Sequence, residues 1–178
     1  PLPQNAVVEH TIAEVDQVAQ TMQRAFKRSG SRYKNVAVAV AGSHVISKLV
    51  NMPAGLSDRD MKMQIEMEAD RYIPYPLDEV NLDFQVMGAA EAGGEQVNVL
   101  IAACRKEIVD DYLAVTQGAG LIPTIIDIET YAMENAYSLI AQHMPGGGME
   151  KTIALVDVGA TTTNINVMHD NRSVYTRD

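Results

Sequence analysis

The 178-residue sequence has no tryptophan, one cysteine and no apolar run that approaches the length of a membrane-spanning helix. A single cysteine cannot form an intramolecular disulfide, so a reducing compartment such as the cytoplasm is expected. That residue, Cys104, lies in the apolar run Leu100–Cys104, which favours a buried structural thiol over a nucleophile. No segment has the pattern of a secretory signal peptide.

Positive charge is also scarce. The chain has 14 Lys and Arg against 23 Asp and Glu, which gives a net charge of −9. Nucleic acids and anionic lipids favour clustered cations, so neither is expected as a general partner, and no direct membrane insertion is expected. A basic cluster between Arg24 and Lys34 is interpreted as the solvated end of a helix, where the helix dipole favours cations.

The histidines do not have the spacing of metal ligands, and the sequence contains no Cys/His cluster. It therefore predicts no zinc site. The histidines are His10, His44, His143 and His169.

Hydrophobic residues make up 47% of the sequence, and their spacing predicts alternating helices and strands. The first helix is expected to begin at a capping box, Thr11–Glu14, and to end at Gly30. The small apolar segment Asn35–Ala41 predicts a strand that is central in a sheet. A further strand is expected at His44–Asn51.

The middle of the chain predicts a second, smaller unit. A helix is expected from Ser57 to the segment Ile73–Pro76, because a residue before proline is disfavoured in the α-conformation. Alternating segments on either side of Gly93 and Gly94 predict a hairpin, followed by a helix at Lys106–Gln117. We predict an α+β block at residues 43–120, inserted into a larger α/β domain formed by residues 1–42 and 121–178.

The C-terminal part predicts a strand, a helix and a hairpin with a turn at Gly159 and Ala160. Apolar residues from Ile153 to Val158 predict a covered strand. Ile165 and Val167 alternate with two asparagines, which is typical of a half-buried partner strand. The strand before this hairpin is expected at Leu121–Ile128, the helix at Glu129–Met144 and a last strand at Arg172–Tyr175.

The turn of this hairpin is a candidate anion site. Gly159 allows the backbone to approach a ligand, and successive backbone amides at such a turn can bind phosphate. Hydroxyl donors follow at Thr161, Thr162 and Thr163, and Asp157 can hold a water or Mg²⁺. The alternative is an ordinary hairpin turn that uses Gly for its geometry and Thr for its strand propensity.

The stretch Asp157–Thr163 resembles the second phosphate loop of the actin-like ATPases, which include actin, sugar kinases and the cell-division protein FtsA. The sequence departs from the usual bacterial form at Ala160, where a second Gly is common, and at Asn164, where Asp is common. The inserted strand–helix–strand–strand–helix block resembles FtsA and the type IV pilus assembly protein family PilM. Three stretches resemble the PilM family specifically: Leu2–Glu9, Glu68–Glu79 with its Tyr-Ile-Pro-Tyr-Pro run, and Leu100–Glu107.

The resemblance implies a partial actin-like (ribonuclease H-like) α/β domain, subdomain 1A, with an inserted FtsA-like α+β subdomain 1C. It implies that the full-length protein binds ATP and Mg²⁺, with Asp157 acting through the metal or water and Glu129 matching the residue that positions attacking water. For Glu129, a carboxylate favoured by the N-terminal helix dipole is the alternative. The first phosphate loop and the adenosine-binding half are expected outside Pro1–Asp178, so this chain alone is expected to bind nucleotide weakly at best and not to catalyse.

The resemblance also implies a partner: the N-terminal cytoplasmic tail of the inner-membrane protein PilN, held in a groove between the two subdomains. The expected walls are the segment Arg71–Pro76 and the sequence around Arg105, with Tyr75 as an anchor. The protein is then cytoplasmic, peripheral to the inner membrane, and in contact with other pilus machinery proteins. The alternatives are an FtsA-like division scaffold and a fragment of a sugar- or acetate-kinase-type enzyme.

Overall fold

The computed structural model describes residues 1–90, 94–159 and 162–177. The chain forms two compact units, one of Pro1–Asn35 with His44–Pro123 and one of Val36–Ser43 with Thr124–Asp178. This division places the first helix with the middle block. The subdomain boundaries expected from the sequence therefore remain a prediction. No helix within the described ranges is long and apolar enough to cross a membrane.

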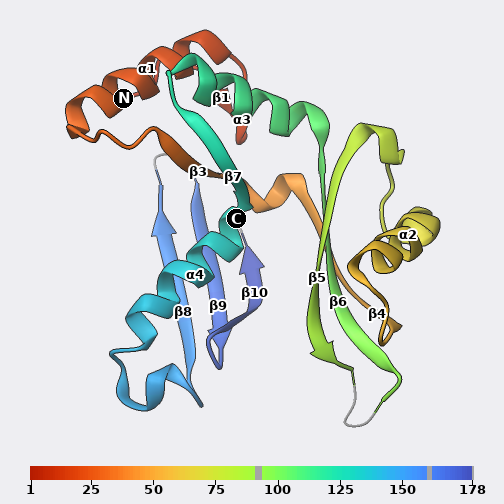
Figure 1. Cartoon of the computed structure of the whole chain (residues 1–178). Helices are drawn as coiled ribbons and strands as arrows, with labels where there is room; N and C mark the ends of the chain where they lie inside the picture. Colours follow the sequence, from red (N-terminus) through yellow and green to blue (C-terminus); the bar gives the residue numbers. More distant parts are fainter. Residues whose placement is uncertain (91–93, 160–161, 178) are drawn as a thin grey trace. The chain divides into compact units, whose positions relative to one another are not determined.

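The first unit contains a three-stranded antiparallel sheet, and helix α2 covers one face of it (Figure 1). The strands are β4 (Val45–Pro53), β5 (Val80–Ala89) and β6 (Gln96–Arg105), in the order β4-β6-β5. The core under α2 (Asp58–Glu68) consists of Met52, Met61, Ile65, Val99 and Ile101. The predicted inserted block of β, α, β, β and α elements is confirmed, with α3 (Lys106–Gly118) as its last helix.

Two helix ends in this unit follow the sequence signals. Ser57 caps α2 because its hydroxyl accepts a hydrogen bond from the Asp60 amide at 3.2 Å. The helix ends in a 3-10 turn, η2 (Ala69–Arg71), and a second short turn, η3 (Leu77–Glu79), leads into β5. Gly30 ends α1 (Val15–Ser29) with a φ of 69°, in the left-handed region that glycine adopts most readily.

The predicted capping box Thr11–Glu14 is wrong. Thr11 and Ile12 form strand β2, which pairs with β1 (Val7–Val8), and α1 begins three residues later without a side-chain cap. The carbonyl of the fully buried Ala6 accepts hydrogen bonds from the amides of Ala13 and Glu14, at 3.0 and 3.2 Å. The backbone before the helix is therefore satisfied by a tertiary contact, and a threonine cap is not needed.

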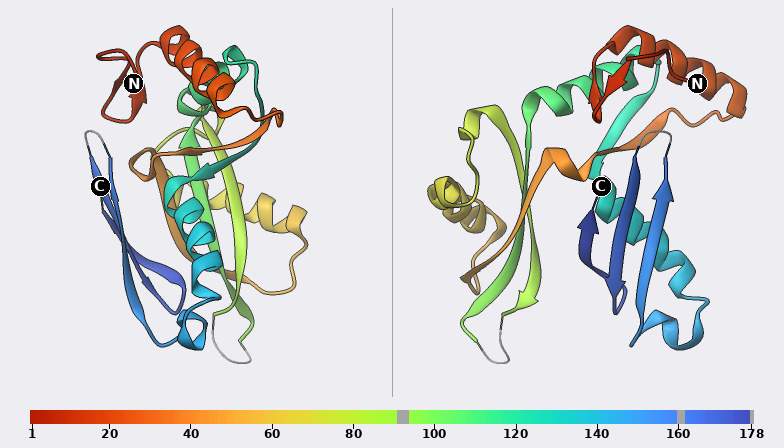
Figure 2. Two further views of the ribbon diagram at one scale, coloured as in Figure 1. Left: turned by 90° about the vertical axis from the view of Figure 1, so that its left-hand side faces the viewer. Right: turned by 180° about the vertical axis from the view of Figure 1, so that it is seen from behind.

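Helix α1 packs along α3 (Figure 2). Val18 and Ala19 are buried against Val115 of α3. A Cβ atom at Gly118 would lie 3.1 Å from the Cβ of Ala19, so the glycine allows the two helices to come close.

The second unit contains two sheets. Strand β3 (Asn35–Val40) pairs with β7 (Ile122–Ile128), and the Thr124 hydroxyl donates to the Val36 carbonyl at 3.3 Å. Among the described residues β3 pairs with β7 alone, so the structure does not place it at the centre of a sheet as predicted, although its last residue, Val40, is buried. The short 3-10 helix η1 (Gly42–His44) follows β3 before β4 begins.

The other sheet carries the candidate phosphate hairpin. It consists of β8 (Thr152–Val158), β9 (Thr163–His169) and β10 (Arg172–Arg177), antiparallel in the order β10-β9-β8. Helix α4 (Glu129–Ala141) lies along one face, where Tyr137 and Ala141 pack with Met168, Ile153 and Leu155 (Figure 1). The 3-10 turn η4 (Pro145–Gly148) joins α4 to this sheet. The α/β class predicted from the sequence is confirmed.

Candidate functional site

The first candidate site is the end of the β8–β9 hairpin. The two strands pair in continuous register from Thr152 opposite His169 to Val158 opposite Thr163. The Gly159 amide donates to the Thr162 carbonyl at 2.9 Å, which closes the turn. The predicted hairpin is therefore confirmed, while the predicted ligands Ala160 and Thr161 lie outside the described residues.

Gly159 is required for space. Its φ is not positive, so the backbone conformation itself does not demand glycine. A Cβ atom at this position would lie 3.0 Å from the carbonyl oxygen of Thr162, which is closer than ordinary van der Waals contact. Glycine is therefore needed here for clearance from the Thr162 carbonyl and not for a positive φ.

The buried face of β9 is the opposite of the one predicted. Asn166 is 2% exposed and Met168 is equally buried, whereas Ile165 faces solvent. Asn166 is satisfied in the interior because its Nδ2 donates to the Thr130 carbonyl at 3.3 Å and its Oδ1 accepts from the Ser173 hydroxyl at 2.6 Å. A buried amide is stable where its hydrogen bonds are made, so polarity alone does not identify the solvent face.

Strand β8 is not covered as predicted. Ile153 and Leu155 face α4, but Val156 and Val158 on the other face are 58% and 75% exposed. A strand with one covered face alternates between buried and exposed positions, even where its residues are apolar on both sides.

The predicted carboxylates lie at one end of the covered face. Glu129 is the first residue of α4 and lines a narrow cleft with Gly42, Thr130, Met133, Asn164, Ile165, Asn166 and Thr176. Asp157 is the cross-strand partner of Asn164, and alternation places it on the α4 side with Leu155. The structure thus brings Glu129 and the hairpin together, and Asp157 lies beside the cleft without lining it.

The cleft is too small for a nucleotide as it stands. Its cavity volume is about 10 Å³, close to what one water molecule needs. The Oδ1 atom of Asn164 is buried there without a hydrogen-bond partner among the described residues. Oxygen ligands of this kind suit Mg²⁺, which commonly binds one or two carboxylates together with phosphate oxygens. The described residues contain no group of three or more His, Cys, Asp or Glu that could hold a metal alone.

The second candidate site is the predicted wall of the first unit, where the structure brings Tyr75 and Arg105 together. The guanidinium carbon of Arg105 lies 5.7 Å from the centre of the Tyr75 ring, in cation–π range. Arg105 also pairs with Glu107 at 2.6 Å, which fixes its orientation. Tyr75 remains 41% exposed, so one part of its ring is available to a partner.

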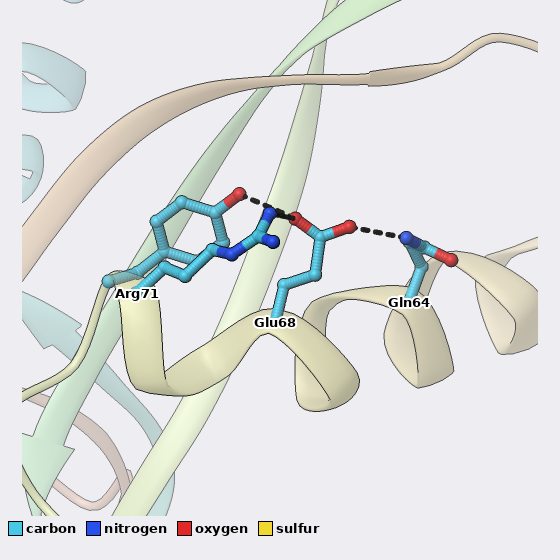
Figure 3. Close-up of polar contacts among 4 residues, drawn as sticks. Gln64, Glu68 and Arg71 are labelled. Atoms are coloured by element: carbon cyan, nitrogen blue, oxygen red, sulfur yellow. Dashed lines mark hydrogen bonds and ion pairs between the residues drawn. The ribbon is translucent and has the colours of Figure 1, made fainter.

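Arg71, the third predicted residue of this wall, belongs to a cluster centred on Glu68 (Figure 3). Glu68 accepts hydrogen bonds from the Gln64 side chain, the Tyr72 hydroxyl at 3.0 Å and the Arg71 guanidinium at 3.1 Å. The bond from Gln64, then those from Tyr72 and Arg71, hold the pKa of the Glu68 carboxyl below its ordinary value. Burial, together with Glu68, raises the pKa of the Tyr72 hydroxyl.

Sequence reasoning missed two sets of side-chain contacts at these candidate sites. One set is the cluster around Glu68. A spacing of four residues places Gln64, Glu68 and Tyr72 on one helix face, and this spacing was the signal in the sequence that could have predicted their contacts. The contacts of Asn166 with Thr130 and Ser173 join residues distant in the sequence and had no local signal. Tyr72 packs against two of the core clusters in the first unit.

A family model described as type IV pilus assembly protein PilM matches residues 1–178. A chain in a solved structure described as the PilM-PilN type IV pilus biogenesis complex is similar, with a TM-score of 0.81 and 28% identity over 99% of this chain and 52% of that chain. The cytoplasmic domain of EpsL, an inner membrane component of the type II secretion system of Vibrio cholerae, has a TM-score of 0.52 and 13% identity over 92% of this chain and 56% of that domain.

At 13% identity the EpsL likeness shows the fold alone. The chain spans about half the length of both solved chains. The predicted fold, an actin-like α/β domain with an inserted α+β block, is confirmed. The whole-chain family match favours the pilus family over the FtsA-like scaffold and the kinase-type enzyme.

Replacing Gly159 by Val should lower the free energy of unfolding by about 1–3 kcal/mol, because the new Cβ must displace the Thr162 carbonyl. Thermal unfolding followed by circular dichroism measures this loss. The control is Thr163→Val, which puts the same β-branched side chain in the adjoining strand and should change little. An unchanged melting temperature for Gly159→Val would mean that the turn has room to spare.

Glu68→Gln should remove a pH-dependent part of the stability. A carboxyl whose folded pKa is lowered stabilises the native state above its unfolded pKa, and this contribution is lost as the pH falls through the folded pKa. The difference in melting temperature between wild type and Glu68→Gln should therefore be largest near neutral pH and disappear in acid. The control is Glu66→Gln on the same helix. Glu66 pairs with Lys62 at 4.0 Å, and such a long, exposed ion pair adds little to stability. A difference that is independent of pH would contradict the role given to the carboxylate.

Proposed function

Because the chain belongs to the type IV pilus assembly protein PilM family, we propose that it is the part of a pilus-assembly component that docks the N-terminal cytoplasmic tail of PilN. The description of a similar solved structure names PilM and PilN together as a complex. Docking holds the protein at the cytoplasmic side of the inner membrane through its partner. There it links the membrane components to other proteins of the pilus machinery.

The observation that carries this proposal is the paired wall of Tyr75 and Arg105. A tyrosine between two prolines loses little backbone freedom on binding, and the guanidinium of Arg105 already lies over its ring. The ring offers apolar area and a hydroxyl to an incoming side chain. An extended tail is the ligand that such a short, preformed wall fits best.

The two arginines have hydrogen-bonding capacity left for the tail. Arg71 is 74% exposed in its side chain and uses one nitrogen on Glu68, and Arg105 uses one nitrogen on Glu107. A guanidinium has five N–H donors in a planar fork, so each arginine keeps donors for backbone carbonyls or a carboxylate of the tail. The glutamates fix the direction in which those donors point.

Tyr75→Ala, Arg71→Ala and Arg105→Ala should each weaken binding of a PilN tail peptide by about tenfold or more, since each removes an interface anchor. Fluorescence anisotropy of a labelled peptide measures the affinity, and circular dichroism shows that the variants are folded. Tyr33→Ala and Arg59→Ala are matched controls, because both residues are exposed in the same unit and away from the wall. Wild-type affinity in all three folded variants would remove this wall from the docking site.

The full-length protein is further proposed to bind ATP with Mg²⁺ at the hairpin. Backbone amides and hydroxyls of Gly159, Ala160, Thr161, Thr162 and Thr163 would hold phosphate. Asp157 would hold the metal through water, with Glu129 as the weaker candidate for positioning water. When bound, Mg²⁺ neutralises phosphate charge. A nucleotide needs more room than the closed cleft at Glu129 offers, so this proposal requires that the hairpin and α4 separate on binding.

This chain alone should show no measurable ATP turnover and at best weak nucleotide binding. Phosphoryl transfer requires several groups that converge on the phosphates and the metal. The described residues provide no such metal cluster. A phosphate-release assay measures turnover, with Asp157→Asn as the control for a contaminating ATPase. Stoichiometric hydrolysis by the wild type that is abolished in Asp157→Asn would contradict the prediction.

A further inference from the structure

Cationic side chains are concentrated near the start of this acidic chain. Residues 17–57 contain six of the 14 Lys and Arg and none of the 23 Asp and Glu. The remainder of the chain therefore carries more negative charge than the net value of −9. Five of the six cations fall within eleven residues: Arg24, Lys27, Arg28, Arg32 and Lys34.

The fold places three of these side chains on one face of α1 and leaves the other two exposed just after the helix end. Arg24, Lys27 and Arg28 are spaced i, i+3 and i+4 on α1, so they share one face of the helix. That face is opposite the buried Val18 and Ala19, which pack against α3 (Figures 1 and 2). Arg32 and Lys34 follow in the exposed segment after Gly30. The five cations are called the α1 cationic face.

No carboxylate pairs with the α1 cationic face in the described part of the chain. Arg24 donates to the Thr21 hydroxyl at 3.0 Å and Lys27 to the Gln23 amide oxygen at 3.5 Å, and both acceptors are neutral. The helix dipole accounts for Lys27 and Arg28, which lie in the last turn. It does not account for Arg24, one turn earlier, or for Arg32 and Lys34 beyond the helix end.

We propose that the α1 cationic face binds the anionic surface of a lipid bilayer. Long cationic side chains without a carboxylate partner suit a layer of mobile anionic headgroups, which attracts each nearby Lys or Arg. Tyr33, between Arg32 and Lys34, is 85% exposed, and tyrosine is enriched at membrane–water interfaces. These cations lie in the last turns of α1 and in the exposed segment directly after it, so a planar anionic surface can contact several of them together.

Two other polyanions fit the same face less well. Single-stranded nucleic acid is usually held by several stacked aromatic side chains, and this face has one exposed aromatic residue. An acidic protein is usually bound by oriented cations such as Arg71 and Arg105, each held by a glutamate. The cations of the α1 face have no such support. That a membrane lies close to this protein in the cell rests on the proposed function, whereas the binding of lipid by the α1 cationic face does not.

The binding is weak and adds to tail docking. Five surface cations give an attraction that salt screens within about 10 Å at ordinary ionic strength. A partner anchored in the same membrane raises the local concentration of lipid, so two weak attachments reinforce each other. The face would also orient the chain on the membrane.

Co-sedimentation with vesicles tests the proposal in the absence of any PilN peptide. Vesicles of phosphatidylcholine with about one-third phosphatidylglycerol should bind the wild-type chain at low salt, and pure phosphatidylcholine should not. The triple variant Arg24→Gln, Lys27→Gln and Arg28→Gln should bind the anionic vesicles at least about tenfold more weakly than the wild type. Glutamine keeps the helix propensity of these exposed positions, and circular dichroism checks the fold.

The matched control is the triple variant Arg59→Gln, Lys62→Gln and Arg172→Gln, which removes the same charge from exposed sites elsewhere. It should bind anionic vesicles nearly as well as wild type. Equal loss in both triple variants, or no preference of the wild type for anionic vesicles, would overturn the proposal.

Poly-glutamate and single-stranded RNA are competitors in the same assay. Binding to either one without binding to anionic vesicles would replace the membrane by an acidic protein or by nucleic acid. Because the assay contains no tail peptide, its result is separate from that of the docking experiment. Loss of tail binding with intact vesicle binding would refute the docking wall alone.

Discussion

The C-terminal unit depends on one buried amide. Asn166 joins β9 to β10 through the Ser173 hydroxyl and to the first turn of α4 through the Thr130 carbonyl. These two bonds determine which side of β9 faces the helix, because a shift of one residue would turn every side chain of the strand to the other face. The Ser173 amide also donates to Glu134 at 2.8 Å, so α4 is held to the sheet at two points, one on β9 and one on β10. The position of Glu129 relative to the hairpin follows from this arrangement.

Local signals in the sequence were sufficient for most of the secondary structure. Ser57, Gly30 and the two prolines around Tyr75 mark boundaries by chemistry that acts within a few residues, and the structure follows them. The inserted block was predictable for the same reason, since the sequences of β5 and β6 alternate on either side of a glycine-containing loop and Ser57 marks the start of α2. The family resemblance added the connection between these elements.

Interactions between distant residues produced the errors. Thr11 has the pattern of a helix cap, but the carbonyl of Ala6 satisfies the amides before α1. The asparagines of β9 have the pattern of a solvent face, but Asn166 makes its hydrogen bonds in the interior. Its partners are Thr130, which lies 36 positions away in the sequence, and Ser173, which lies seven positions away. At the candidate docking wall, the contact between Tyr75 and Arg105 also joins separate elements. The resemblance named both residues, and the structure supplied their contact.

The uncovered face of β8 has a practical consequence. Val156, Val158 and their neighbour Ile165 form an apolar surface on a sheet, and β8 pairs with a single strand among the described residues. Such a surface promotes association, and the rate of association rises with the square of the protein concentration because two molecules must meet. Self-association of this chain is therefore expected to begin at this face of β8.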